Sequence, residues 1–228
     1  MATLAIETAT DACSVAVGDG ERIFVDHRVE PRRHNRLLLP MIDSLLATAG
    51  LTRRDLDLVA FGCGPGSFTG VRIAAAAAQG IAFALELPVA RISTLEGLAH
   101  TTWRRVRPGR GVVTACVSRA REILLAAYAV RGEALRPVLE ARASGVAGAV
   151  AHLGDCAGFA VAGDAAAALL QTAAAEGLGL TDSGVCHPEA EDLLALAVRA
   201  RERGDLVSAD GAIPVYLSVD SPWRKMPR

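Results

Sequence analysis

Aromatic side chains make up only 4% of this 228-residue chain, although hydrophobic residues reach 51%. The shortage of rings excludes a core built on bulky aromatic packing, and the many alanines favour close contact between helices and sheets instead. Charged residues make up 21%, which together with the apolar content excludes global disorder. A formal net charge of −1 excludes a general attraction for nucleic acid, because that attraction grows with the number of phosphates neutralised.

Paired cysteines, a leader sequence and a convincing membrane span are also missing. The odd number and wide spacing of the cysteines exclude a disulfide framework and a zinc site. They are Cys13, Cys63, Cys116, Cys156 and Cys186. The N-terminus, "MATLAIETAT", has no basic stretch and reaches Glu7 too early for a signal peptide. The most apolar segment, residues 71–85, is interrupted by Gln79 and dominated by alanine, so we expect it not to cross a bilayer. The sequence predicts a soluble, cytoplasmic protein without membrane contact.

What is present is an element order that occurs twice. Each half of the chain shows three strand-like segments, a helix, a strand and a helix, followed by a further helix. A charged, turn-rich stretch at 104–111 separates the halves. The pattern predicts an α/β protein of two lobes, each a mixed sheet of βββαβα order with flanking helices. We place the first lobe at 1–105, completed by 206–228, and a second, smaller lobe at 106–205.

The glycine-rich stretch "FGCGPGSFTGVR", residues 61–72, lies between an expected strand and an alanine-rich helix. Such loops cradle phosphates when they carry a Lys, but this one has only Arg72, and Pro65 removes a backbone donor. A structural turn is therefore favoured over a phosphate site, with Ser67 or Thr69 capping the helix. The residues assigned to this turn are Gly64, Pro65, Gly66, Ser67, Thr69 and Gly70.

A second polar turn, "ETATD", follows the first expected strand. Its Glu7, Thr8, Thr10 and Asp11 are of the types that hold a metal or touch a phosphate, so ATP or ADP binding here is a candidate property. The alternative is a polar hairpin end, because Asp and Thr favour turns in any case. One carboxylate without a Lys makes rapid hydrolysis an unfavoured interpretation, and no required cofactor is predicted.

Two helices carry apolar residues over more than one stripe, which predicts a contact surface beyond their own sheet. Small residues on the second helix would let another helix approach closely. Packing on the protein's own sheet alone is the alternative for each position. The predicted partner-contact residues are Leu37, Leu38, Met41, Leu45, Ile73, Ala76, Ala77 and Gly80.

Four segments together resemble one protein family. They are "LAIETATDACSVAV", "HNRLLLPMIDSLLATAGL", "GCGPGSFTGVRIAAAAAQGIAFALELPVARISTLEGLA" and the C-terminal "PVYL…PWRKMP". The chain resembles the TsaB (YeaZ) family of bacterial tRNA threonylcarbamoyladenosine biosynthesis proteins, within the ASKHA (actin-like ATPase) superfamily. The resemblance is dense over residues 1–100 and weaker over 111–205.

This resemblance implies a subunit with no catalytic residues, which pairs with a TsaD-type catalytic relative through a bundle of helices. A TsaE-type ATPase would join the complex, tRNA would be met indirectly, and self-pairing is expected when the partner is absent. The catalytic relatives grip a metal with an H-x-x-x-H pair, and Thr94 and Leu98 stand in those positions here. No metal site is therefore predicted.

Other functions remain open at this point. A small-molecule kinase or ATPase of the same superfamily is the main alternative, and a metallopeptidase, suggested by an older family name, is opposed by the missing histidines. Arginine clusters at 32–36 and 104–110, with the tail "PWRKMPR", are each compatible with RNA phosphates. Solvated faces are the favoured interpretation, because aromatics are few and the chain has no net positive charge.

Overall fold

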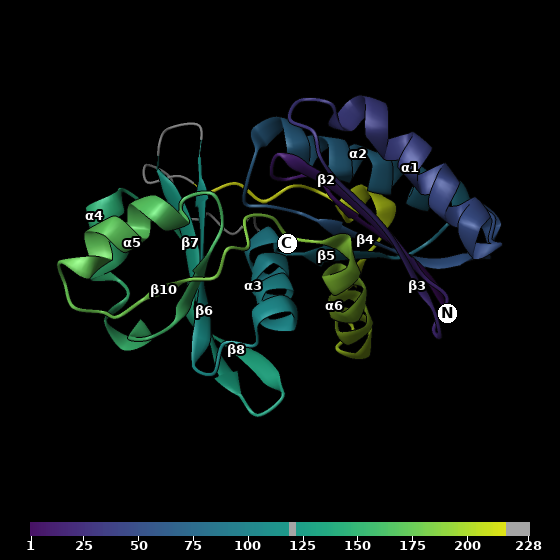
Figure 1. Ribbon diagram of the computed structural model, residues 1–228. Helices are drawn as coiled ribbons and strands as arrows, with labels where there is room; N and C mark the ends of the chain where they lie inside the picture. The colour runs from purple at the N-terminus through teal and green to yellow at the C-terminus, as the bar shows by residue number, and fades with distance from the viewer. Residues whose placement is uncertain (119–121, 218–228) are drawn as a thin grey trace. The chain divides into compact units, whose positions relative to one another are not determined.

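The computed structural model describes residues 1–118 and 122–217, and its contacts divide the chain into two compact units (Figure 1). Unit 1 comprises residues 1–97 and 188–215, and unit 2 comprises residues 98–187 with Tyr216 and Leu217. Each unit is built on one mixed sheet with helices against it, as predicted. The five cysteines are free thiols and four of them are buried, in agreement with the expectation from their spacing.

Unit 1 holds a six-stranded sheet in the order β11-β5-β4-β1-β2-β3. The strands β1, β4 and β5 are parallel, whereas the pairs β1–β2, β2–β3 and β5–β11 are antiparallel. Its elements are β1 (Ala2–Glu7), β2 (Ala12–Gly18), β3 (Ile23–Val29), α1 (His34–Ala49), η1 (Arg53–Asp55), β4 (Leu56–Gly62), α2 (Phe68–Leu85), β5 (Val89–Ile92), the first turn of α3 (Thr94–Val106), α6 (Ala190–Glu202), β11 (Leu206–Val207) and η3 (Ala209–Gly211).

Two apolar layers fill unit 1, one on each face of the sheet. Side chains of α1 and α2 pack with Leu4, Ile6 and Phe61 on one face, and those of α6 pack with Leu58 on the other. Strands β1 and β2 are buried along their whole length, as continuous apolar runs between two helical layers should be. Figure 1 shows α1 and α2 next to each other, and they are in contact.

Unit 2 holds a five-stranded sheet in the order β10-β9-β6-β7-β8, covered on one face by α4 and α5. The hairpin-linked strands β6, β7 and β8 are antiparallel, and β9 and β10 join them in parallel. Its elements are the rest of α3, β6 (Gly111–Val117), β7 (Ile123–Arg131), β8 (Ala134–Ser144), α4 (Val146–Ala151), η2 (Gly154–Cys156), β9 (Ala160–Ala162), α5 (Ala166–Ala174) and β10 (Thr181–Asp182).

The division of the chain differs from the predicted lobes 1–105 and 106–205. Helix α6 was assigned to the second lobe, but its apolar side packs on the sheet of unit 1, where Leu193 approaches Gly97. The chain therefore returns to unit 1 at Pro188, before α6, and the boundary in the first half falls inside α3, after Gly97. Element order alone could not show which sheet an amphipathic helix covers, because either sheet can bury such a face.

Candidate functional site

The glycine loop after β4 is tied to three separate parts of unit 1. Gly64 donates its backbone N–H to the Thr94 hydroxyl (3.2 Å), and its carbonyl accepts from the Thr94 N–H (3.0 Å). Ser67 donates its N–H to the Ala9 carbonyl at 2.7 Å, and Val215 donates to the carbonyl of Cys63, also at 2.7 Å. The loop is thus fixed by the end of β1, the start of α3 and the C-terminal segment, and the bond from Gly64 occupies one of its backbone donors.

Helix α2 begins directly from this loop. The Ser67 side chain accepts from the N–H of Gly70 at 3.3 Å, so Ser67 rather than Thr69 is the cap. The peptide bond between Gly64 and Pro65 is cis, and Gly64 has a φ of +97°, which only glycine adopts without strain. Because a Cβ on Gly66 would lie 2.5 Å from the Ala9 carbonyl oxygen, the loop must pack backbone against backbone.

Glu7 lies under the loop and is 1% exposed. One carboxylate oxygen accepts from the Ala9 N–H (2.7 Å) and the other accepts from the Thr94 hydroxyl (3.1 Å). A Cβ on Gly62 would lie 1.9 Å from this carboxylate, so the glycine makes room for Glu7. Burial raises the pKa of Glu7 to about 7, against the opposing effect of the hydrogen bonds from Ala9, Thr94 and Thr8.

The first prediction follows from this pKa. Because the folded-state pKa (about 7) lies above the ordinary value of 4.5, the stability that Glu7 contributes is full below pH 4.5 and is lost as pH rises through 7. The loss amounts to roughly 3 kcal/mol at most. Glu7→Gln, which stays neutral, should therefore unfold at higher urea than the wild type at pH 8, and the two should converge at pH 5.

Urea unfolding at the two pH values measures the effect. The matched control is Glu21→Gln, because Glu21 is exposed in the β2–β3 turn of the same unit and should leave the pH profile unchanged. A wild-type profile that runs parallel to that of Glu7→Gln between pH 5 and pH 8 would show that Glu7 is not buried as the structure places it.

The residues proposed for nucleotide contact are not brought together as an open site. Thr8 is fully buried, like Glu7, and its hydroxyl donates to the Gly70 carbonyl at 2.8 Å. Thr10 is half-buried and accepts from the Ala12 N–H at 3.3 Å, while Asp11 is exposed. Glu7 and Thr8, the two side chains best suited to a metal-bound phosphate, are therefore hydrogen-bonded within the fold. Their surroundings are those of a polar turn, the alternative interpretation.

The two positions at which the catalytic relatives carry histidines are occupied here by residues that stabilise the fold. Thr94 joins Glu7 to the glycine loop, and Leu98 is completely buried. Within residues 1–118 and 122–217, no group of three or more His, Cys, Asp and Glu side chains is arranged to hold a metal ion.

The predicted contact residues separate into two groups. Leu38, Met41 and Leu45 of α1 are 2%, 1% and 8% exposed and lie in the core of unit 1, so for them the prediction of a partner surface is wrong. They follow the core-facing stripe of α1, which a sequence pattern cannot distinguish from a second stripe. Leu37 is half-buried against the same core.

On α2 two of the predicted residues face outward and two lie at the edge of the core, beside the buried stripe of Val71, Ala74 and Ala78. Ala76 and Gly80 are exposed, and Ile73 and Ala77 are half-buried. One turn further on lies Phe83, whose side chain is 80% exposed and which the sequence pattern did not single out. We call Ile73, Ala76, Ala77, Gly80 and Phe83 the α2 face; it is an apolar stripe that widens from small residues to an exposed ring.

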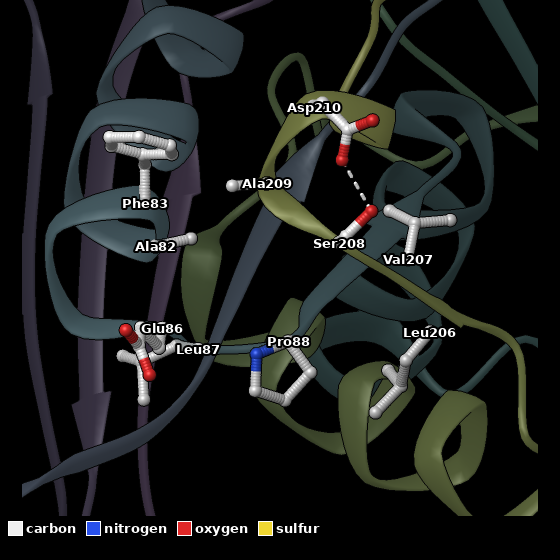
Figure 2. Close-up of a pocket in the computed structure, with 10 residues that line it drawn as sticks. All are labelled: Ala82, Phe83, Glu86, Leu87, Pro88, Leu206, Val207, Ser208, Ala209 and Asp210. Carbon is white, nitrogen blue, oxygen red and sulfur yellow. Dashed lines mark hydrogen bonds between the residues drawn. The ribbon is translucent and has the colours of Figure 1, made fainter.

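The α2 face ends at a pocket of about 780 Å³ (Figure 2). Its walls come from the last turn of α2, the connection between α2 and β5, and the segment 206–210. Phe83, Leu87 and Pro88 give it an apolar surface, and Glu86 and Asp210 add two carboxylates. The hollow therefore suits an apolar side chain next to a cationic one.

Helix α2 also passes the test of length and apolar composition for a membrane span, the one helix to do so within residues 1–118 and 122–217. The expectation that composition alone would exclude such a span was therefore too strict. One side of the helix belongs to the core of unit 1, and the core helix of a soluble protein can have the same length and apolar composition.

The basic tail also carries a sequence prediction. Its residues Trp223, Arg224, Lys225 and Arg228 lie outside the described residues.

Comparisons with known proteins agree on a family. The family model described as "TsaD: tRNA N6-adenosine threonylcarbamoyltransferase" matches residues 28–204. The tRNA threonylcarbamoyladenosine biosynthesis protein TsaB of Escherichia coli (strain K12) is 35% identical, covering 100% of this chain and 99% of its own length. TsaB of Haemophilus influenzae is 34% identical, with 98% and 96% covered. The solved structure "YeaZ from Pseudomonas aeruginosa" has a TM-score of 0.84 at 36% identity, with 95% and 99% covered.

These comparisons confirm the predicted fold of two ASKHA-like lobes. The matching family model is named after the transferase, but the relatives that match over nearly their full length are named TsaB or YeaZ. Similarity over the whole length is the more specific result, because a model of one shared fold can match several related families. The chain belongs to the TsaB (YeaZ) family of tRNA threonylcarbamoyladenosine biosynthesis proteins.

Proposed function

We propose that this protein is a non-catalytic subunit that binds and stabilises a TsaD-type catalytic subunit during tRNA threonylcarbamoyladenosine synthesis. The observation that carries the proposal is the α2 face, an exposed apolar stripe with a phenylalanine 80% exposed at its end. Exposed apolar stripes of this kind mark surfaces that another protein covers. Small residues allow a partner helix to approach α2 closely, and Phe83 would supply the aromatic anchor typical of interface centres.

The non-catalytic part of the proposal is supported by what Glu7, Thr8 and Thr94 do. Their polar groups bond to the glycine loop and to the start of α2, so they fix the position of the proposed interface helix. In this role the subunit requires no nucleotide of its own. The pocket beside Phe83 would take an apolar side chain and a neighbouring Lys or Arg of the partner, because Glu86 and Asp210 line it. We propose the same face for self-pairing when the partner is absent, and a TsaE-type ATPase as a further member of the complex.

Co-purification of the full chain with a TsaD-type subunit is the direct test, and Phe83→Ala makes it residue-specific. Loss of an anchoring ring should weaken the complex by about 2 kcal/mol, or roughly 30-fold in Kd. Folding stability should change little, because the ring is 80% exposed. Isothermal titration calorimetry measures the first quantity and urea unfolding the second.

The control for this prediction is Val198→Ala. Val198 is a 40% exposed apolar residue on α6, the helix that covers the other face of the sheet, so its truncation should leave binding intact. Failure of the wild-type chain to co-purify with the catalytic subunit would refute the proposed function. Wild-type affinity in Phe83→Ala would place the interface elsewhere.

A further inference from the structure

One end of the unit 2 sheet gathers arginines from three segments of the chain. Arg107 and Arg110 lie in the connection between α3 and β6, Arg131 ends β7, and Arg136 lies on β8. Strand pairing brings them together: Arg136 is opposite Ala129, which is opposite Gly111, and the Val130 N–H donates to the Arg110 carbonyl at 2.9 Å. We call these four residues the arginine end. Only the arginines at 104–110 are neighbours in the sequence; Arg131 and Arg136 join them through the fold.

All four side chains are exposed, and within the part of the chain that the structure describes none of them is in an ion pair. The guanidinium of Arg107 lies 4.8 Å from the centre of the Trp103 ring, a cation–π contact that positions the group without neutralising its charge. Arg28 and Arg53, by contrast, form ion pairs with Asp26 and Asp43 in unit 1. The Arg131 guanidinium donates to the Val130 carbonyl at 3.3 Å, a neutral acceptor that leaves its charge in place. This end of unit 2 therefore carries positive charge that no described carboxylate pairs with.

A hollow of about 530 Å³ lies at the arginine end. Arg110 and Arg131 line it, with the Gly109 backbone, the carboxylate of Asp155 and the apolar side chains of Val138 and Phe159. Arg110 is held in place over Gly158, where an added Cβ would lie 3.2 Å from the Arg110 side-chain Cδ. The volume is within the range of sites that enclose small ligands, so a phosphate with its sugar fits here.

We propose that the arginine end binds the sugar–phosphate backbone of RNA. Guanidinium groups match phosphate oxygens with paired N–H donors, and several such groups along one sheet end suit a strand that repeats its charge. The presence of Asp155 favours RNA over an acidic protein as the ligand. A carboxylate only accepts hydrogen bonds and repels another carboxylate, but it accepts well from the ribose 2′-hydroxyl, which also distinguishes RNA from DNA. The family's part in tRNA modification makes tRNA the natural probe.

The test measures the binding of fluorescently labelled tRNA transcript to the full chain by anisotropy, at 50 and 200 mM salt. The test variant is Arg107→Gln/Arg110→Gln/Arg131→Gln. Its control is Arg28→Gln/Arg53→Gln/Arg203→Gln, which removes the same charge from arginines that are ion-paired. We expect the test variant to bind roughly tenfold to thirtyfold more weakly at 50 mM salt, with a shallower salt dependence, and the control to stay close to wild type.

A second comparison examines the sugar. Wild type should prefer an RNA stem-loop to its 2′-deoxy counterpart, and Asp155→Asn should lessen that preference without weakening phosphate binding. Equal losses in the two triple variants, undetectable binding by the wild type, or displacement by polyglutamate as effective as by RNA would each overturn the proposal. The chain is assayed without a TsaD-type subunit, so the result does not depend on whether the α2 face binds one.

Discussion

Replacing Gly80 by arginine is expected to abolish the complex with the TsaD-type subunit while the chain itself remains folded. Gly80 is exposed at the centre of the α2 face, and a Cβ added there would meet nothing within 4 Å. The free protein therefore accommodates the larger side chain in water. In the complex the same charge would be buried against apolar atoms without a partner, at a cost of about 3–4 kcal/mol, or a several-hundredfold rise in Kd.

Gly80→Ala is the matched control for this substitution. Alanine keeps the face small and apolar, so binding should persist, and the loss of backbone freedom in the unfolded chain should raise the stability of α2 by roughly 0.5–1 kcal/mol. Calorimetric titration with the catalytic subunit and urea unfolding of each variant separate the two effects. Binding by Gly80→Arg at wild-type strength would exclude the α2 face from the interface. Gly80 is also a sharper target than Ala77, which is half-buried against the core.

Much of the fold could be predicted, because alternation and helical periodicity are local properties of a sequence. The longer strands of both sheets and the helices α1 and α2 occur where the patterns placed them, whereas the short edge strands β10 and β11 matched no strand pattern. The assignment of α6 failed for a physical reason: its apolar side fits any sheet with a free face, and only the folded chain shows that it packs on the sheet of unit 1. The spacing of residues along one helix does not indicate which of two distant sheets that helix covers.

The site shows the same limit at the level of single residues. Glycines predicted a tight loop, and a loop is found, but the pattern gave no sign that Thr94, thirty residues further on, would bond to it. Glu7 resembled a metal-handling carboxylate in sequence, and burial beneath Gly62 gives it another role. On α1 the leucine stripe could belong to a core or to a partner, and Leu38 and Leu45 belong to the core. Exposure of Phe83 could be learned only from the folded chain.

These contacts connect the glycine loop to α2, the helix that we propose for the interface. Glu7 and Thr94 hold the glycine loop from below, Ser67 caps α2, and Thr8 bonds to the first turn of the same helix. Because the loop is fixed at several points, the direction of α2 is set before any partner arrives. A preformed interface loses less conformational freedom on binding, which favours affinity. The glycine loop therefore contributes to the proposed function by fixing the position of α2.

Gly70→Ala tests this connection and should strongly destabilise the chain. A Cβ at position 70 would lie 1.9 Å from the Thr8 carbonyl oxygen and 3.0 Å from its carbonyl carbon. Both atoms are backbone, so no side-chain rotation relieves the clash, and the hydrogen bond from the Thr8 hydroxyl to the Gly70 carbonyl (2.8 Å) must break or stretch. We expect a loss of about 3–5 kcal/mol in the free energy of unfolding.

The same substitution ten residues further along α2 gives the comparison, because Gly80→Ala should stabilise the protein where Gly70→Ala destabilises it. Intrinsic helix propensity favours alanine at both positions, so a difference in sign would come from the close backbone contacts with Thr8 and Ala9. If Gly70→Ala still folds, its α2 is displaced from the end of β1 and should bind the catalytic subunit more weakly than its stability alone accounts for. Urea unfolding and calorimetric titration measure the two losses, and equal stability of Gly70→Ala and wild type would refute the close approach of α2 to β1.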